Sequence, residues 1–101
     1  MQREILQKAI KKYGASKQMD MCIEEMSELT KAICKIKREL SSGDGFTKVE
    51  TLNNLYEEIA DVEIMLEQMR IMFASDKEID EQKEYKLNRL KNRLEEWWYG
   101  K

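Results

Sequence analysis

Apolar residues recur at helical spacing through four segments of this chain, and no other feature limits its fold as strongly. The segments cover about residues 2–13, 18–41, 47–74 and 75 to the end. The chain has no proline and 4 glycines in 101 residues, so little interrupts a helix. We therefore predict an all-α fold, an antiparallel four-helix bundle, built as a single domain of residues 1–101.

The two central segments carry the strongest stripes. Residues spaced three and four apart share one helix face and predict the side that is buried. On the second segment these residues are Cys22, Met26, Leu29, Ile33, Ile36 and Leu40. On the third they are Leu52, Leu55, Ile59, Val62, Leu66, Met69 and Phe73.

The boundaries between segments have their own signals. Gly14 follows the first stripe and is expected to end that helix, as glycine often does. The segment 41–48, "SSGDGFTK", is the one place where Gly, Ser and Asp cluster, which predicts a loop. The T-x-x-E and S-x-x-E patterns at Thr47–Glu50 and Ser75–Glu78 predict capping boxes that begin the third and fourth helices.

Charge and hydropathy exclude several kinds of partner. The formal net charge is −2 with both signs interleaved, so no basic patch indicates nucleic acid or an anionic membrane. No apolar run approaches the roughly 18 residues that span a bilayer, and the first residues lack the apolar core of a signal peptide. We expect a cytoplasmic protein without a nucleic-acid or membrane partner.

Cysteine and histidine usage narrows the chemistry. Cys22 and Cys34 would lie about 18 Å apart along one helix, too far for a disulfide, so both are expected as reduced thiols. The chain has no histidine. This excludes histidine acid–base catalysis, zinc or haem sites with histidine ligands, and the Glu-x-x-His pattern of di-iron bundles.

Four carboxylates occupy matching positions on the two central segments. Glu25 and Glu28 fall about 60° and 120° from the centre of the apolar stripe of their helix. Glu58 and Asp61 fall at the same two offsets on theirs. If these helices pack antiparallel, the four acids converge on one pocket.

Converging carboxylates without a basic partner repel one another and need a cation. Hard oxygen ligands select Mg²⁺, with Mn²⁺ as a substitute, over zinc or copper. Carboxylate-bound Mg²⁺ usually keeps waters and takes substrate phosphate oxygens, so phosphate chemistry is indicated. The alternative is a solvated acidic face, the ordinary meaning of an isolated E-x-x-E pair.

The motifs "EEMSE" at 24–28 and "EIAD" at 58–61 resemble the paired EExxE…ExxD signature of the all-α nucleoside triphosphate pyrophosphatases. That group includes the MazG-like proteins and the dimeric dUTPases. The resemblance covers about residues 5–72 and is closest to the short, single-domain members of phages and prophages. The 29 residues between Glu28 and Glu58 slightly exceed the usual gap of the family.

The resemblance implies an enzyme that hydrolyses a (d)NTP between the α- and β-phosphates, giving the monophosphate and pyrophosphate. It also implies a homodimer or homotetramer. The implied metal ligands are Glu25, Glu28, Glu58 and Asp61. Glu24 and Glu25 are the implied catalytic acids, and Lys31 and Asn54 are candidates for phosphate or sugar contacts.

A function of another class stays open beside this one. The chain could be a non-catalytic, oligomeric helical interaction module whose acids form a solvated or degenerate site. Stabilisation by Mg²⁺ in thermal melting would separate the two, because a ligand that binds only the folded form raises Tm.

Overall fold

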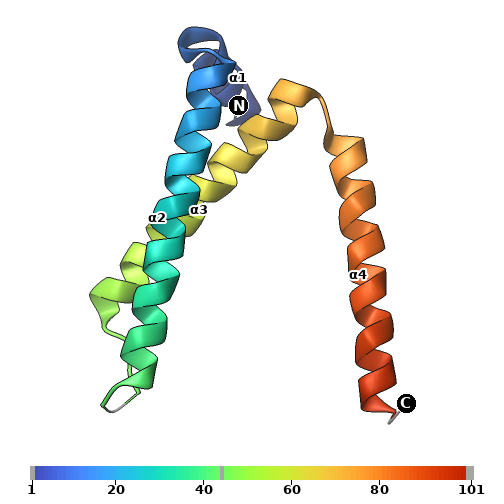
Figure 1. Ribbon diagram of the computed structural model, residues 1–101. Coiled ribbons are helices and arrows are strands. Elements are labelled where there is room, and N and C mark those ends of the chain that lie inside the picture. The colour runs from blue at the N-terminus through green and yellow to red at the C-terminus, as the bar shows by residue number, and fades with distance from the viewer. Residues whose placement is uncertain (1, 44, 100–101) are drawn as a thin grey trace.

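The computed structural model describes residues 2–43 and 45–99, which form four helices and no strand. They are α1 (Gln2–Tyr13), α2 (Ala15–Ser41), α3 (Val49–Phe73) and α4 (Asp76–Trp98) (Figure 1). The prediction of an all-α fold is confirmed. The second helix begins at Ala15 instead of near residue 18, because Gly14 alone separates it from α1. Gly14 has φ 91°, a conformation that suits glycine.

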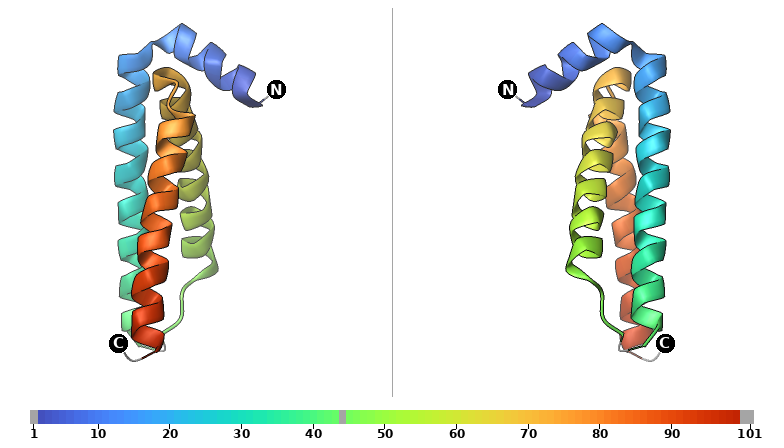
Figure 2. Two further views of the ribbon diagram at one scale, coloured as in Figure 1. Left: turned by 90° about the vertical axis from the view of Figure 1, so that its right-hand side faces the viewer. Right: turned by 90° about the vertical axis from the view of Figure 1, so that its left-hand side faces the viewer.

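Helices α2 and α3 run antiparallel and side by side, and they contain most of the core (Figures 1 and 2). Helix α1 lies across one end of this hairpin and adds the buried Leu6. The facing sides of α2 and α3 meet along a seam. Its residues follow one another at alternating spacings of three and four along each helix, as in a coiled coil. The buried and half-buried members of this seam are Gln18, Cys22, Glu25, Leu29, Ala32, Ile36 and Glu39 on α2, and Thr51, Leu55, Glu58, Val62, Met65, Met69 and Met72 on α3.

The predicted apolar stripes are therefore only half correct. The seam is centred about 50° away from the centre of each stripe, toward the acidic side. As a result Met26 on α2 is 48% exposed and Phe73 on α3 is 62% exposed. The exposed apolar face of the hairpin, as we define it, consists of Met26, Ile33, Leu40, Ile59, Leu66 and Phe73.

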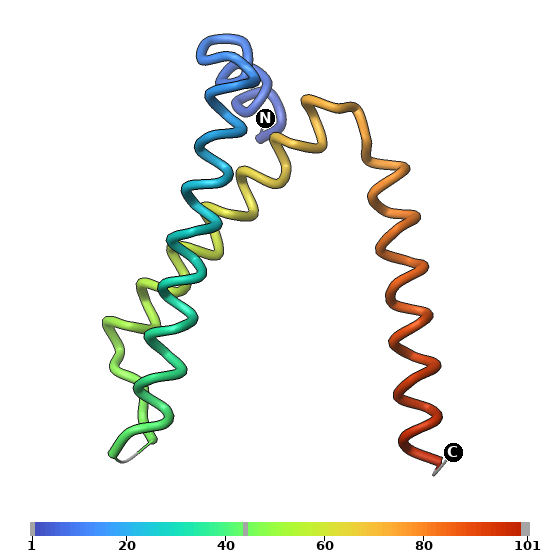
Figure 3. The backbone as a smooth tube through the Cα atoms, in the orientation of Figure 1, coloured from blue at the N-terminus to red at the C-terminus, as the bar shows by residue number. Residues whose placement is uncertain are grey.

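Helix α4 turns away from the hairpin after Ala74, which adopts the left-handed conformation with φ 48° (Figures 1 and 3). None of its residues is buried, and its apolar side chains Leu87, Leu90, Leu94 and Trp97 are exposed. The described residues of one chain therefore do not surround a single core with all four helices. No helix among them combines the length and apolarity that a membrane crossing requires.

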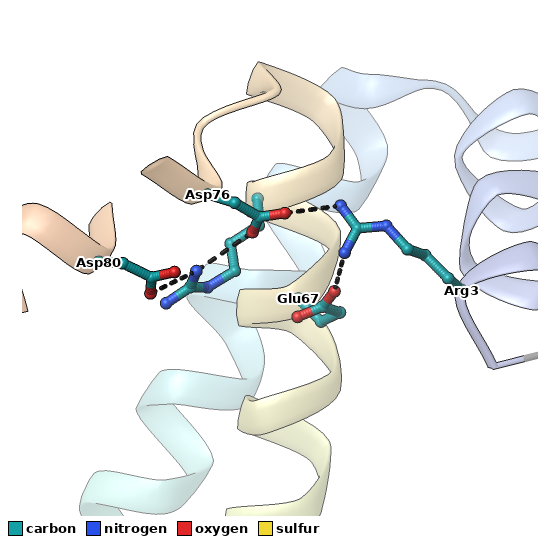
Figure 4. A network of polar contacts seen from close by, with 5 residues as sticks. Arg3, Glu67, Asp76 and Asp80 are labelled. Carbon is teal, nitrogen blue, oxygen red and sulfur yellow. Dashed lines mark hydrogen bonds and ion pairs between the residues drawn. The ribbon is translucent and has the colours of Figure 1, made fainter. Parts of the chain in front are cut away.

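A charged network fixes the start of α4 (Figure 4). Arg3 of α1 donates to Glu67 at 2.8 Å and to Asp76 at 3.0 Å. Arg70 of α3 donates to Asp76 at 3.1 Å and to Asp80 at 3.0 Å. The hydrogen bond from Arg70 lowers the pKa of Asp76. Ion pairs thus join the start of helix α4 to α1 and α3.

The predicted capping boxes do not form. Neither α3 nor α4 has a side-chain hydrogen bond at its N-cap, and the buried Thr47 hydroxyl has no partner within residues 2–43 and 45–99. Glu39 of α2 replaces the cap of α3. One of its carboxylate oxygens accepts from the backbone N–H of Lys48 at 2.9 Å, and the other accepts from the Thr51 hydroxyl at 2.6 Å. An acid from the neighbouring helix therefore satisfies the first turn of α3.

Candidate metal centre

Three of the four predicted carboxylates come together across the middle of the hairpin. One oxygen from each of Glu25, Glu58 and Asp61 lies within 4.8 Å of the other two. Glu25 and Glu58 are half-buried members of the seam, whereas Asp61 is exposed at its rim. The convergence follows from the antiparallel pairing, which sets residues at equal offsets on α2 and α3 opposite each other.

Burial and mutual repulsion act on these acids together. Burial raises the pKa of Glu25, and the charges of Asp61 and Glu58 raise it further. Burial likewise raises the pKa of Glu58, followed by the charges of Asp61 and Glu28. Among the described residues, none of the three carboxylates forms an ion pair with a basic side chain. The group therefore holds uncompensated negative charge.

One oxygen of the group has no partner. The Oε2 atom of Glu58 is buried and accepts no hydrogen bond from the residues that the structure describes. A buried charged oxygen is costly unless a donor or a cation satisfies it.

The donor set fits Mg²⁺ or Mn²⁺. Carboxylate oxygens are the ligands that these hard cations prefer, and no histidine exists to favour zinc. The three carboxylates would occupy some of the coordination positions of the ion. Mg²⁺ usually fills its other positions with water and with phosphate oxygens of a substrate. The free thiols Cys22 and Cys34 contribute no atom to the group.

The fourth predicted ligand, Glu28, lies outside the close group. Its carboxylate pairs with Lys31, with 3.3 Å between Nζ and Oε1. It is still near enough for its charge to raise the pKa of Glu58. Glu28 and Lys31 therefore form a charged pair at the rim of the group, and the pair occupies the Lys31 ammonium that was a candidate for phosphate.

The remaining predicted residues are exposed. Glu24 is adjacent to Glu25 in the chain and its charge contributes to the raised pKa of that residue. Asn54 precedes Glu58 by one helical turn on α3. Both side chains are accessible to a molecule that approaches the acids.

Sequence reasoning missed three buried or half-buried polar residues of the hairpin. Gln18 and Gln68 are each 2% exposed, and Glu39 caps α3. A repeat of seven residues would have indicated the buried face of α2. Its members Gln18, Glu25, Ala32 and Glu39 follow one another at intervals of 7. A search for apolar residues alone places the stripe on the wrong side of this repeat.

Comparison of the chain with protein-family models, with curated proteins and with solved structures finds no match.

Proposed function

We propose that this protein is a nucleoside triphosphate pyrophosphohydrolase that depends on Mg²⁺. Its substrate is a (d)NTP, and its products are the monophosphate and pyrophosphate. The observation that supports this most is the convergence of Glu25, Glu58 and Asp61 with a buried Glu58 oxygen that lacks a partner. The resemblance of the two acidic motifs to those of MazG-like enzymes supports the same function.

The residues divide the work as follows. Glu25, Glu58 and Asp61 would hold Mg²⁺ or Mn²⁺, with Glu28 at the rim. The bound ion would neutralise the triphosphate and stabilise the charge that develops in the transition state. Glu25 orients a water toward the α-phosphorus and accepts its proton. Water oxygen bonds to the α-phosphorus, and the bond from that phosphorus to the bridging oxygen breaks, which releases pyrophosphate.

Exposed groups on the same helices complete the proposed site. The charge of Glu24 helps to raise the pKa of Glu25, and Asn54 and Lys31 contact the sugar or the phosphates. Lys31 reaches a phosphate once its pairing with Glu28 is exchanged, which costs little because both side chains are largely exposed.

We also propose that the active form is a homodimer or homotetramer with the MazG-like bundle. The exposed apolar face of the hairpin and the unburied α4 both present apolar side chains that a second copy would cover. A reducing compartment such as the cytoplasm suits the two free cysteines.

The deciding experiment is pyrophosphate release over a panel of (d)NTPs, with Mg²⁺, with Mn²⁺ and with EDTA. We expect pyrophosphate release from at least one nucleotide, and we expect that release to require the metal. Pyrophosphate release that persists in EDTA, or its absence for every nucleotide, would overturn the proposal.

The exposed apolar surfaces favour a second candidate function, a non-catalytic oligomeric interaction module. That function predicts assembly without pyrophosphate release. It also predicts that Mg²⁺ leaves the melting temperature unchanged, because no ion then binds the folded form selectively.

A further inference from the structure

A pocket of about 430 Å³ lies between α1, α2 and α3 at the end of the hairpin nearest α1. Apolar and aromatic side chains form most of its wall, among them Tyr13, Met21 and Met65. Gln18 of α2 and Gln68 of α3 are the two amide side chains that line it. Pockets of this kind, apolar with a few placed polar groups, bind small organic ligands.

The two glutamines are unusual core residues. Each is 2% exposed, although glutamine is mostly found at the surface. The Oε1 atom of Gln68 is buried and has no hydrogen-bond partner among the described residues. The Nε2 atom of Gln18 reaches only the sulfur of Met21 at 3.6 Å, and thioether sulfur is a weak acceptor. The fold therefore retains amides that its own residues leave poorly satisfied, which a ligand would correct.

The pocket lies near the acidic group along both helices of the hairpin. Gln18 precedes Glu25 by 7 residues and Gln68 follows Asp61 by 7. Each interval is about 10 Å along its helix. Met21 and Met65 line the pocket, and each lies one helical turn from an acid of the group. A nucleotide whose 5′ phosphates lie at the acids would therefore direct its base along the helices toward this pocket.

We propose that this pocket binds the base of the nucleotide substrate and that Gln68 accepts a hydrogen bond from an N–H group of that base. The inference rests on the proposed function for the identity of the ligand. A base has flat apolar faces that suit the methionines and Tyr13, and an edge of donors and acceptors that suits an amide. Gln68 and Gln18 are then the residues that determine base specificity.

Methionine methyl groups allow a direct test. The full chain is labelled with ¹³C at its methionine methyls and titrated with deoxyadenosine, deoxyguanosine, deoxycytidine, thymidine and deoxyuridine. These probes carry no phosphate, so their binding does not need a metal. We expect at least one of them to shift the Met21 and Met65 resonances. If none does, at concentrations up to the solubility of the nucleosides, the proposal is wrong.

Gln68→Leu tests the hydrogen bond, with Gln82→Leu on the exposed side of α4 as the matched control. We expect Gln68→Leu to weaken nucleoside binding about tenfold, the effect of one lost hydrogen bond in a buried site. Its melting temperature should stay equal or rise, because the substitution removes a buried acceptor without a partner. Equal affinity in both variants, or a lower melting temperature with unchanged affinity, would assign Gln68 a structural role only.

Gln68→Asn provides a second variant, since it keeps the amide but withdraws it by one methylene group.

The outcome for the pocket is separable from that for the enzyme. Nucleoside binding that depends on Gln68 without pyrophosphate release would support the pocket and overturn the proposed reaction. Pyrophosphate release whose nucleotide preference ignores Gln68 would support the reaction and overturn the pocket.

Discussion

Glu25 and Glu39 are 14 residues apart on nearly the same side of α2, and both belong to the seam. Their surroundings differ in whether a hydrogen-bond donor or another acid faces the carboxylate. Glu39 accepts hydrogen bonds from the Lys48 backbone and the Thr51 hydroxyl, and the bond from Thr51 lowers its pKa. Glu25 faces Glu58 and Asp61, and its pKa is raised by burial and then by their charges. An acid in a helical seam is therefore no sign of a metal by itself. The sign is that the protein supplies no donor to satisfy it.

The largest expected difference between these two places is in activity. Asp61→Asn keeps the size of the side chain and removes one charge from the acidic group. We expect pyrophosphate release to fall about 100-fold or more, because a metal ligand is lost. Glu57→Gln on the same helix is the control, since its side chain is exposed and outside the group. If Glu57→Gln lowered activity and Asp61→Asn did not, the site would lie on another face of α3.

Mg²⁺ should stabilise the protein through the Glu25 end only. A ligand at 100 times its Kd stabilises the folded form by about 2.7 kcal/mol, which raises the melting temperature of a small domain by roughly 10 °C or more. We expect this rise in the wild-type protein and in Thr51→Val, and its loss in Glu25→Gln. Differential scanning calorimetry with and without Mg²⁺ measures it. A full rise in Glu25→Gln would show that the ion binds elsewhere.

At the Glu39 end, the expected effect is on stability alone. Thr51 is 3% exposed, and Thr51→Val removes the donor to one Glu39 oxygen. We expect a lower free energy of unfolding, because a carboxylate oxygen of the half-buried Glu39 loses its donor. Urea unfolding measures this loss, and pyrophosphate release should change less than about threefold. A collapse of activity at unchanged stability would couple this end to the site.

The smallest expected effect is the pH dependence of the metal-free protein. Since the folded pKa values of Glu25 and Glu58 lie above the ordinary 4.5, the folded state binds more protons just above that pH. Its melting temperature should therefore rise as the pH falls from 7 toward 5. Below about pH 4.5 the trend reverses, because Glu39 and Asp76 have lowered pKa values and lose their favourable contacts on protonation. Melting curves in EDTA check this, and Glu25→Gln should flatten the rise.

Much of the fold follows from local patterns. Helical spacing and Gly14 predict four helices whose ends agree closely with the structure. The matching offsets of the acids on the two helices predict that Glu25, Glu58 and Asp61 converge, because antiparallel pairing brings the same flank of each helix together. These features depend on the angular positions of residues on a single helix, which follow from their spacing in the sequence.

The remainder depends on which partner each face meets. The apolar stripe of α2 is wide enough to serve both the seam and the exposed face, so spacing alone places its centre on Met26 and Ile33 instead of on Glu25 and Ala32. Glu28 illustrates a second limit, because its pairing with Lys31 is a choice of rotamer. The cap of α3 by Glu39 is a contact between helices and has no local signature.

The charged network holds α4 at its first turn only, so the helix can act as a lever that pivots about that turn. The helix has 23 residues and is therefore about 34 Å long, with its fulcrum where Arg3 and Arg70 meet Asp76. A tilt of about 10° at that fulcrum would carry the tip near Trp97 through about 6 Å. Small rearrangements at the end of α3, the helix that supplies Glu58 and Asp61, are therefore enlarged severalfold at the far end of α4. High ionic strength, which weakens ion pairs, loosens the fulcrum and leaves the apolar seam of the hairpin intact.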